Sequence, residues 1–342
     1  MEIIFQNDYF FLIVGFLALI LGAEILIRGS VNLAHIFKVS PFIIGVVIVA
    51  GGTSLPELAA SLQSINLGFE GIVIGNVIGS NVANILLIIG VVALINPIVE
   101  TKSSSDTSFS LVHKVGYFVS KNISDFVAII SSIIFIYFCY KGSIIWIDGL
   151  LMLICLVVFL ISILIKDKAD YEGEHNKSMS LWLSTVLVFV GLFSVIYGSK
   201  LFISGATDIA KNFGLSETVI GITIIAIGTS LPELVTGILA ALKKQTDFAI
   251  GNILGSNVYN IFGVLGVSSL FVNLSIPNIL ERKFVIEDFL ININFSGIIY
   301  DAWFIFIITI LFVLLMRVRK KIGIKTGITF LLFYLIYIIS LI

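Results

Sequence analysis

The hydrophobic positions of this chain fall into ten long apolar runs separated by shorter polar segments. A helix needs about 20 mainly apolar residues to cross the hydrocarbon core of a bilayer, and most of these runs come close to that length or exceed it. The pattern therefore predicts an all-α integral membrane protein with ten transmembrane helices. The predicted spans are 9–27, 40–63, 72–95, 123–140, 146–165, 181–203, 216–242, 249–271, 302–318 and 323–341.

The composition agrees with a membrane location. Hydrophobic residues make up 58% of the 342 residues and charged residues only 12%, whereas soluble domains carry about 25% charged residues. The formal net charge is −1, and no basic tract is present that would suit a nucleic acid. We therefore expect the lipid bilayer as the surroundings and no nucleic-acid partner.

Polar motifs interrupt the apolar runs at two matched places. Gly-Thr-Ser-Leu-Pro-Glu-Leu occurs at 52–58 and again at 228–234, an offset of 176 residues. Gly-Asn-x-x-Gly-Ser-Asn-Val-x-Asn follows at 75–84 and 251–260 with the same offset. Because the ungapped offset pairs all ten runs, we predict two five-helix repeats, at 1–166 and 181–342, joined by a cytoplasmic linker at 167–180.

The distribution of basic residues predicts the orientation. Fifteen of the 20 Lys and Arg residues fall in segments that the ten-span topology places on one side. Cytoplasmic loops carry the excess of Lys and Arg, so both termini should face away from the cytoplasm. Five spans in each repeat then make the second repeat inverted relative to the first, as in many secondary transporters. With a compact linker and no targeting signal, we expect a multi-pass protein of the cell inner (plasma) membrane.

The chemistry of the first motif points to a cation. In a helix, Thr53 and Glu57 share a face and Ser54 flanks it. Pro56 removes one backbone hydrogen bond and kinks the helix, which frees a carbonyl near Gly52. Hard cations such as Ca²⁺ prefer carboxylate, hydroxyl and carbonyl oxygens. The second copy offers the same groups around Glu233.

A buried glutamate has a second interpretation, since it can be protonated and hydrogen-bonded to a neighbouring threonine. Two glutamates in identical contexts favour the cation site, because carboxylates inside a membrane are rare and usually functional. In the second motif, we expect Asn84 and Asn260 to face the glutamates and Asn81 and Asn257 to be mainly structural. The glycines of that motif would allow close helix packing.

Both copies resemble the α-repeats of the cation/calcium exchanger superfamily, close to the prokaryotic sodium/calcium exchangers, over nearly the whole chain. The resemblance implies that Glu57 and Glu233 are the central Ca²⁺ ligands and that Thr53 and Thr229 contribute oxygens. It also implies two sodium sites and a pair of asparagines in the middle. The first sodium site would comprise the Ala50 carbonyl, Thr53, Ser54, Ser256 and Glu233; the second the Ala226 carbonyl, Thr229, Ser230, Ser80 and Glu57; the asparagines are Asn84 and Asn260.

The resemblance further implies alternating access, in which the first and sixth spans slide across the rest. The matched Gly22, Gly29, Gly198 and Gly205 would permit that sliding. Several family members have aspartate at the position of Asn260, so this chain keeps two central carboxylates, and potassium co-transport is in doubt. One Ca²⁺ or two Na⁺ would neutralise the pair, and a third Na⁺ would make exchange sensitive to voltage.

The sequence thus predicts a Na⁺/Ca²⁺ antiporter that is not an enzyme, needs no cofactor and functions as a monomer, with Ca²⁺ and Na⁺ as its substrates. A Ca²⁺/H⁺ antiporter on the same fold is the nearest alternative. A cation channel belongs to a different class and would carry flux without a counter-ion. An intramembrane hydrolase with paired glutamates would need a bound metal or an activated water, and no histidine lies near either glutamate in the sequence.

Overall fold

The computed structural model describes residues 2–99, 123–170, 179–213, 228–276, 297–319 and 321–341. Within these ranges the chain is almost entirely helical, as predicted. Eight helical stretches are long and apolar enough to cross a membrane, and Leu231–Leu242 and Ile324–Ile339 are shorter apolar helices. The first half of the predicted span 216–242 lies outside the described residues, so the count of ten spans stays a prediction.

Two helices are much longer than the sequence predicted. Helix α1 (Glu2–Phe37) has 36 residues and α10 (Leu181–Asn212) has 32. At a rise of 1.5 Å per residue, α1 is about 54 Å long, well beyond the hydrocarbon core. The predicted ends at 27 and 203 were wrong because tertiary contacts extend both helices: Asn32 donates to the Met179 carbonyl and to the Ser184 hydroxyl, and Asn212 donates to Asp8.

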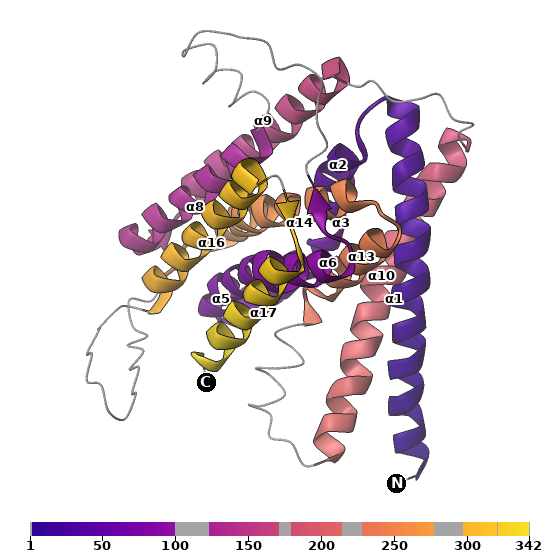
Figure 1. The fold of residues 1–342 in the computed structure, drawn as a ribbon. Coiled ribbons are helices and arrows are strands. Elements are labelled where there is room, and N and C mark those ends of the chain that lie inside the picture. The colour runs from indigo at the N-terminus through magenta and orange to yellow at the C-terminus, as the bar shows by residue number, and fades with distance from the viewer. Residues whose placement is uncertain are drawn as a thin grey trace.

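Helices α1 and α10 lie side by side along the height of the molecule (Figure 1). Glycines make this approach possible, because a side chain at any of them would strike the partner's backbone. A Cβ added at Gly191 would lie 2.6 Å from the amide nitrogen of Leu26, and one at Gly22 would lie 2.9 Å from that of Val195. The remaining glycines of this seam are Gly15, Gly29, Gly198 and Gly205.

The seam revises the role expected for the matched glycines. Gly22, Gly29, Gly198 and Gly205 hold α1 against α10 rather than line a surface along which the pair would slide. Between helices in lipid, close van der Waals packing at small residues replaces the hydrophobic drive. The two helices therefore form one unit, which we call the α1–α10 pair.

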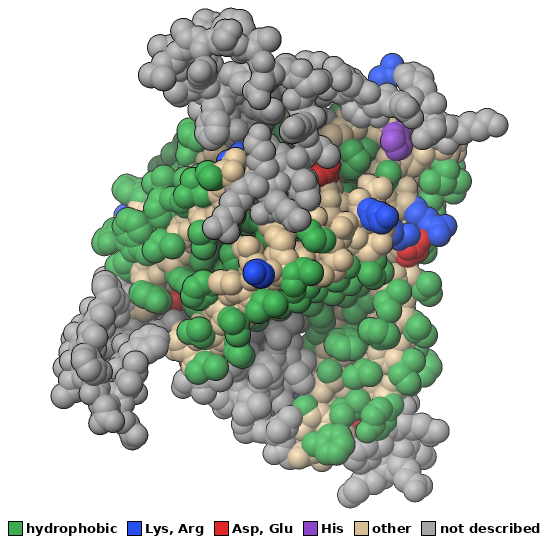
Figure 2. Space-filling view, in the orientation of Figure 1, with side chains coloured by type: hydrophobic (Ala, Val, Ile, Leu, Met, Phe, Trp, Pro, Cys, Tyr) green, Lys and Arg blue, Asp and Glu red, His purple; other side chains and the backbone are tan. Residues whose placement is uncertain are grey.

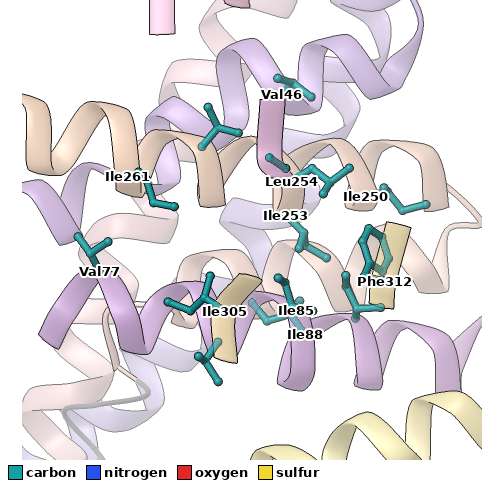
Figure 3. Close-up of a cluster of buried hydrophobic side chains, with 14 of the residues drawn as sticks. Val46, Val77, Ile85, Ile88, Ile250, Ile253, Leu254, Ile261, Ile305 and Phe312 are labelled. Atoms are coloured by element: carbon teal, nitrogen blue, oxygen red, sulfur yellow. The ribbon is translucent and has the colours of Figure 1, made fainter. Parts of the chain in front are cut away.

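The centre of the molecule is a crossing of two broken helices. One runs through α5 (Glu70–Val82), the π-helix η2 (Ala83–Ile88) and α6 (Ile89–Ile95). The other runs through α14 (Thr246–Val258), the π-helix η4 (Tyr259–Val264) and α15 (Leu265–Phe271). Their buried aliphatic side chains interlock, with Ile85 and Ile88 facing Ile253 (Figure 3). The π-turns start one residue before Asn84 and Asn260, and such turns often occur at functional sites.

The polar motif with the proline interrupts its helix, as predicted. The first copy lies in a series of short pieces: α2 (Pro41–Ile44), the π-helix η1 (Gly45–Val49), α3 (Ala50–Thr53) and α4 (Leu55–Asn66). The break falls at Ser54, with φ −82° and ψ 1°. In the second copy α13 (Leu231–Leu242) begins after Ser230, at φ −87° and ψ 7°.

The remaining helices pack around this centre (Figure 1). They are α8 (Ile123–Lys141), α9 (Trp146–Asp170), α16 (Gly297–Arg319) and α17 (Ile324–Ile339). Hydrophobic side chains cover much of the face seen in Figure 2, as expected for a surface in lipid. Helices α8 and α16 are joined by an ion pair between Asp125 and Arg317.

Two short antiparallel strand pairs connect distant parts of the chain. Strand β1 (Ile98–Val99) pairs with β4 (Lys321–Ile322), and β2 (Ser143–Ile144) pairs with β3 (Leu274–Ser275). Each pair joins the segment after a central broken helix to the segment before the last helix of the other half. Helices α9 and α17 begin 178 residues apart, so the expected ungapped offset of 176 is wrong there. The ends of α8 and α16 are also 178 residues apart, so the two extra residues lie before the end of α16 and not in the turn that follows it.

Candidate cation site

Glu57 and Glu233 lie in the first turns of α4 and α13, directly after the two breaks. Each is 1% exposed. The positive end of a helix dipole favours an acidic side chain at this position. Both segments meet helix α14: Ser256 of α14 donates to Glu233, and Thr53, one turn before Glu57, donates to Asn252 of α14. The two halves of the chain thus bring both carboxyl groups to one buried region.

Glu233 is surrounded by residues from both halves. The Ser256 hydroxyl donates to its Oε1 at 3.5 Å, and the Thr53 hydroxyl also interacts with this carboxyl group. These are members of the first predicted sodium site. Ala50, Ser54 and Thr53 of that set are buried, with exposures of 0%, 4% and 0%.

Glu57 has a smaller set of described neighbours. The Ser80 hydroxyl lies beside its carboxyl group. Ser230 is buried and Thr229 half-buried at the matching break. Ala226, the predicted carbonyl ligand of this second set, lies outside the described residues.

Seven buried side-chain oxygens of the predicted set have no hydrogen-bond partner within the described ranges. A buried polar group without a partner is costly, and most such groups in folded proteins are satisfied. All seven belong to acceptor-capable groups, which suits a cation rather than an anion. They are Ser54 Oγ, both Glu57 carboxyl oxygens, Asn84 Oδ1, Ser230 Oγ, Glu233 Oε2 and Asn260 Oδ1.

One of the two central asparagines, Asn84, forms a hydrogen bond that crosses between the halves. Asn84 Nδ2 donates to Asn257 Oδ1 at 2.9 Å, which leaves the Asn84 oxygen available. A structural role for Asn257 agrees with its prediction. Asn81 was predicted to be structural too, but its buried amide has no partner in the described part of the chain. That Asn84 and Asn260 ligate a cation stays a prediction.

A polar network behind the carboxyl groups was missed by sequence reasoning. Asn252 is fully buried; its Oδ1 accepts from Thr53, and its Nδ2 donates to Thr236. The matched Asn76 instead donates to the Glu57 carbonyl and to the Ser61 hydroxyl. Both asparagines belong to the repeated motif, which was the available signal, but their partners lie 15 to 199 residues away in the sequence.

Tyr259 is a second residue that the sequence did not single out. Its hydroxyl donates to the Val47 carbonyl at 3.0 Å, inside the π-helix η1. A Cβ at Gly51 would lie 3.0 Å from the Tyr259 ring, so the glycine makes room for it. The matched positions are Ala83 and Ile227, which carry no hydroxyl. The matched positions therefore cannot supply the same hydrogen bond to the backbone of the other copy.

Glu24 and Arg28 lie one helical turn apart on α1 and form an ion pair at 2.6 Å. The structure adds a third member, because Lys243 lies 2.7 Å from the same carboxylate. Arg28 and Lys243 line an open cavity of about 470 Å³ at the end of α13, and neither central glutamate lines it. Glu24 is therefore engaged in ion pairs rather than in the candidate cation site.

The sequence matches a family model, that of the sodium/calcium exchanger proteins, over residues 8–165 and again over 183–342. The chain belongs to this family. The two matched stretches correspond to the two halves that carry the paired motifs, and together they cover almost the whole chain.

Individual relatives and solved structures agree with this membership. An uncharacterised membrane protein of Methanocaldococcus jannaschii is 33% identical over 310 residues, which are 86% of this chain and 95% of that protein. The sodium/calcium exchanger MaX1 of Methanosarcina acetivorans is 28% identical over 312 residues, 79% of this chain and 84% of that one. A solved structure of the sodium–calcium exchanger NCX_Mj has a TM-score of 0.78 at 32% identity, covering 99% of this chain and 100% of that chain.

Proposed function

We propose that this membrane protein is a secondary antiporter that exchanges Na⁺ for Ca²⁺ by alternating access at the site around Glu57 and Glu233. The observation that carries the proposal is the pair of buried carboxyl groups among oxygens without hydrogen-bond partners. Such a site needs positive charge to be stable in a membrane interior. One Ca²⁺ or two Na⁺ would balance two carboxylates, and competition for the same oxygens would make the process an exchange.

The chain's own residues have distinct roles in this proposal. Glu57 and Glu233 supply charge. Thr53, Ser54, Ser256 and the Ala50 carbonyl would hold sodium near Glu233, and Thr229, Ser230, Ser80 and the Ala226 carbonyl would hold it near Glu57. Asn84 and Asn260 would line the middle. Ca²⁺ and Na⁺ are transported substrates in this account, not resident cofactors.

Several contacts support two inverted five-helix repeats, at 1–166 and 181–342 with a linker at 167–180. The α1–α10 seam is reciprocal: Gly22 approaches Val195 and Gly198 approaches Leu19, and these pairs exchange under the offset of 176. Ser194 donates to the carbonyl of its own counterpart, Ala18. Contacts of this kind are expected around a two-fold axis. The exchanged strand pairs β1–β4 and β2–β3 support the same relation.

The proposed setting is the plasma membrane, with both termini outside the cytoplasm and the Lys-rich segments inside. Because one chain carries both carboxyl groups, the proposed functional unit is the monomer.

A Ca²⁺/H⁺ antiporter is the second candidate function, because a buried carboxyl group can also exchange a proton. The name of one relative, the putative antiporter CaxA of Alkalimonas amylolytica, specifies no counter-ion; it is 35% identical over 76% of this chain.

The test is uptake of ⁴⁵Ca²⁺ into proteoliposomes that are loaded with Na⁺ and diluted into Na⁺-free buffer. We expect uptake that requires internal Na⁺ and disappears in Glu57→Gln. Uptake driven by a pH gradient alone would select the proton antiporter. Uptake that needs no counter-ion would indicate a channel and contradict the proposal.

A further inference from the structure

A hydroxyl on the α1–α10 pair holds the backbone of the second site segment. In a helix, the amide at 232 would bond the carbonyl at 228, but Pro232 has no N–H. The Ser199 hydroxyl of α10 donates to the Gly228 carbonyl instead, at 3.1 Å. Ser199 is 3% exposed. A buried hydrogen bond thus ties α10 to the residue five positions before Glu233.

An ion pair ties the same helix pair to the far end of α13. Lys243 follows the last residue of α13, and its Nζ lies 2.7 Å from the Glu24 carboxylate of α1. The two side chains are 32% and 26% exposed. Both contacts therefore join the α1–α10 pair to α13 or to the turn that precedes it.

Neither contact can form between the matched positions of the other half. The offset of 176 places Ala23 at the position of Ser199 and Leu67 at the position of Lys243. Alanine and leucine side chains donate no hydrogen bond. The counterpart of Glu24 is Lys200, which reverses the charge. The glycine seam is two-fold symmetric, whereas these two contacts are not.

We propose that Ser199 and the Glu24–Lys243 pair act as a one-sided tether, which favours the conformation seen here over the counterpart in which the two halves have exchanged conformations. The inference rests on the proposed alternating access. In an inverted-repeat transporter the two halves exchange conformations between the two open states. A contact available to one half alone stabilises one state, and Ser199 is a positioning residue for the second site segment.

The tether should appear as a difference between the two faces of the membrane. At each face of the membrane, an ion binds the state that is open to that face. Its apparent affinity there is proportional to the population of that state. A single hydrogen bond changes an equilibrium by about twofold to tenfold. In Ser199→Ala, the ratio of the apparent KM for Ca²⁺ at the two faces, measured in right-side-out and inside-out vesicles, should move toward one by that factor.

Further variants distinguish loss of the tether's hydrogen bond from loss of side-chain packing at position 199. Ser199→Thr keeps the hydroxyl and should keep the wild-type ratio. Adding Ala23→Ser to Ser199→Ala transfers the donor to the first half and should carry the ratio past one. Lys243→Gln should shift the ratio in the same direction as Ser199→Ala. Lys244→Gln is the control, because Lys244 is exposed and has no ion pair with any described residue.

A thiol-labelling measurement, which does not depend on ion transport, tests the tether separately from the proposed exchange function. Gln245 lines the cavity of about 470 Å³ beside α1 and Lys243. With Cys139 and Cys155 replaced, the thiol-labelling rate of Gln245→Cys should change by about twofold to tenfold in Ser199→Ala but not in Ser199→Thr. An unchanged labelling rate and an unchanged KM ratio in a Ser199→Ala protein that still exchanges ions would overturn the tether. A wild-type protein that labels as expected but exchanges no cation would overturn the proposed function instead.

Discussion

The two copies of the Gly-Thr-Ser-Leu-Pro-Glu segment have similar backbone conformations but lie in different surroundings. Both break at serine with nearly the same dihedral angles, and both bury a glutamate to 1% exposure. Around the first copy, Tyr259 covers Gly51 and bonds the Val47 carbonyl. Beside the second copy, Ser199 bonds the Gly228 carbonyl. The same local sequence thus gives nearly the same dihedral angles at the break, while neighbours from elsewhere in the chain stabilise the two copies through different hydrogen bonds.

Binding a cation and favouring one conformation place different requirements on the two halves of the chain. A cation that visits one buried cluster needs oxygens of the same type from both halves, so the motif residues repeat. A bias toward one of the two proposed open states needs a difference in free energy between them, and residues without a match in the other half can supply it. We therefore expect substitutions at matched ligands to act alike and substitutions at unmatched neighbours to act differently.

The largest effect should come from the carboxyl groups. Glu57→Gln and Glu233→Gln each remove one unit charge, which is worth about 4 kcal/mol at 4 Å with an effective dielectric constant near 20. Both should reduce Na⁺-dependent ⁴⁵Ca²⁺ uptake by more than about a hundredfold. Glu70→Gln, at the start of α5, should retain uptake. If one central variant stayed active, the two glutamates would not be equivalent.

The second-largest effect is expected from substitutions in the glycine seam between α1 and α10, and matched positions should lose similar amounts of stability. A methyl group at Gly191 would lie 2.6 Å from the Leu26 amide nitrogen, and overpacking of this kind typically costs about 1–3 kcal/mol. Gly191→Ala and its counterpart Gly15→Ala should lower the Tm in detergent by similar amounts. Gly71→Ala, at an exposed position, should leave the Tm unchanged. Unequal losses at the two seam positions would contradict the reciprocal packing.

The matched asparagines should differ from each other. Asn252→Ala leaves both Thr53 and Thr236 without an amide partner in a fully buried position, at a cost of about 1–3 kcal/mol. Asn76 is half-buried, so Asn76→Ala should cost about 1 kcal/mol or less. Equilibrium unfolding of the two purified variants would measure the difference. Equal losses would mean that the network across the halves adds nothing.

The smallest effect is expected at the unmatched tyrosine. Tyr259→Phe removes the bond to the Val47 carbonyl and keeps the ring against Gly51, so the loss should be about 1 kcal/mol. Because Val47 precedes Ala50 by one helical turn, the apparent affinity for Na⁺ should fall by about twofold to fivefold. Tyr140→Phe, at an exposed tyrosine that accepts from Trp303, serves as the control in the same Na⁺ titration.

Much of the architecture could be read from the sequence. Long apolar runs predicted the helices. Pro56 and Pro232 predicted the breaks, because a proline has no N–H and interrupts a helix anywhere beyond its first turn. The duplicated motif identified the glutamates that the fold then buries together. The ends of α1 and α10 could not be read in this way, since Asn32 and Asn212 extend the helices through partners more than 140 residues away.

The sequence by itself determined the membrane class, the duplication and the residue types of the candidate site, because these follow from local composition, periodicity and spacing. Only the tertiary structure decided that the seam glycines join α1 to α10, that Asn84 pairs with Asn257, and that Ser199 and Lys243 both act on the second half. Those contacts arise where helices cross, and a crossing depends on the packing of the whole chain rather than on any single segment.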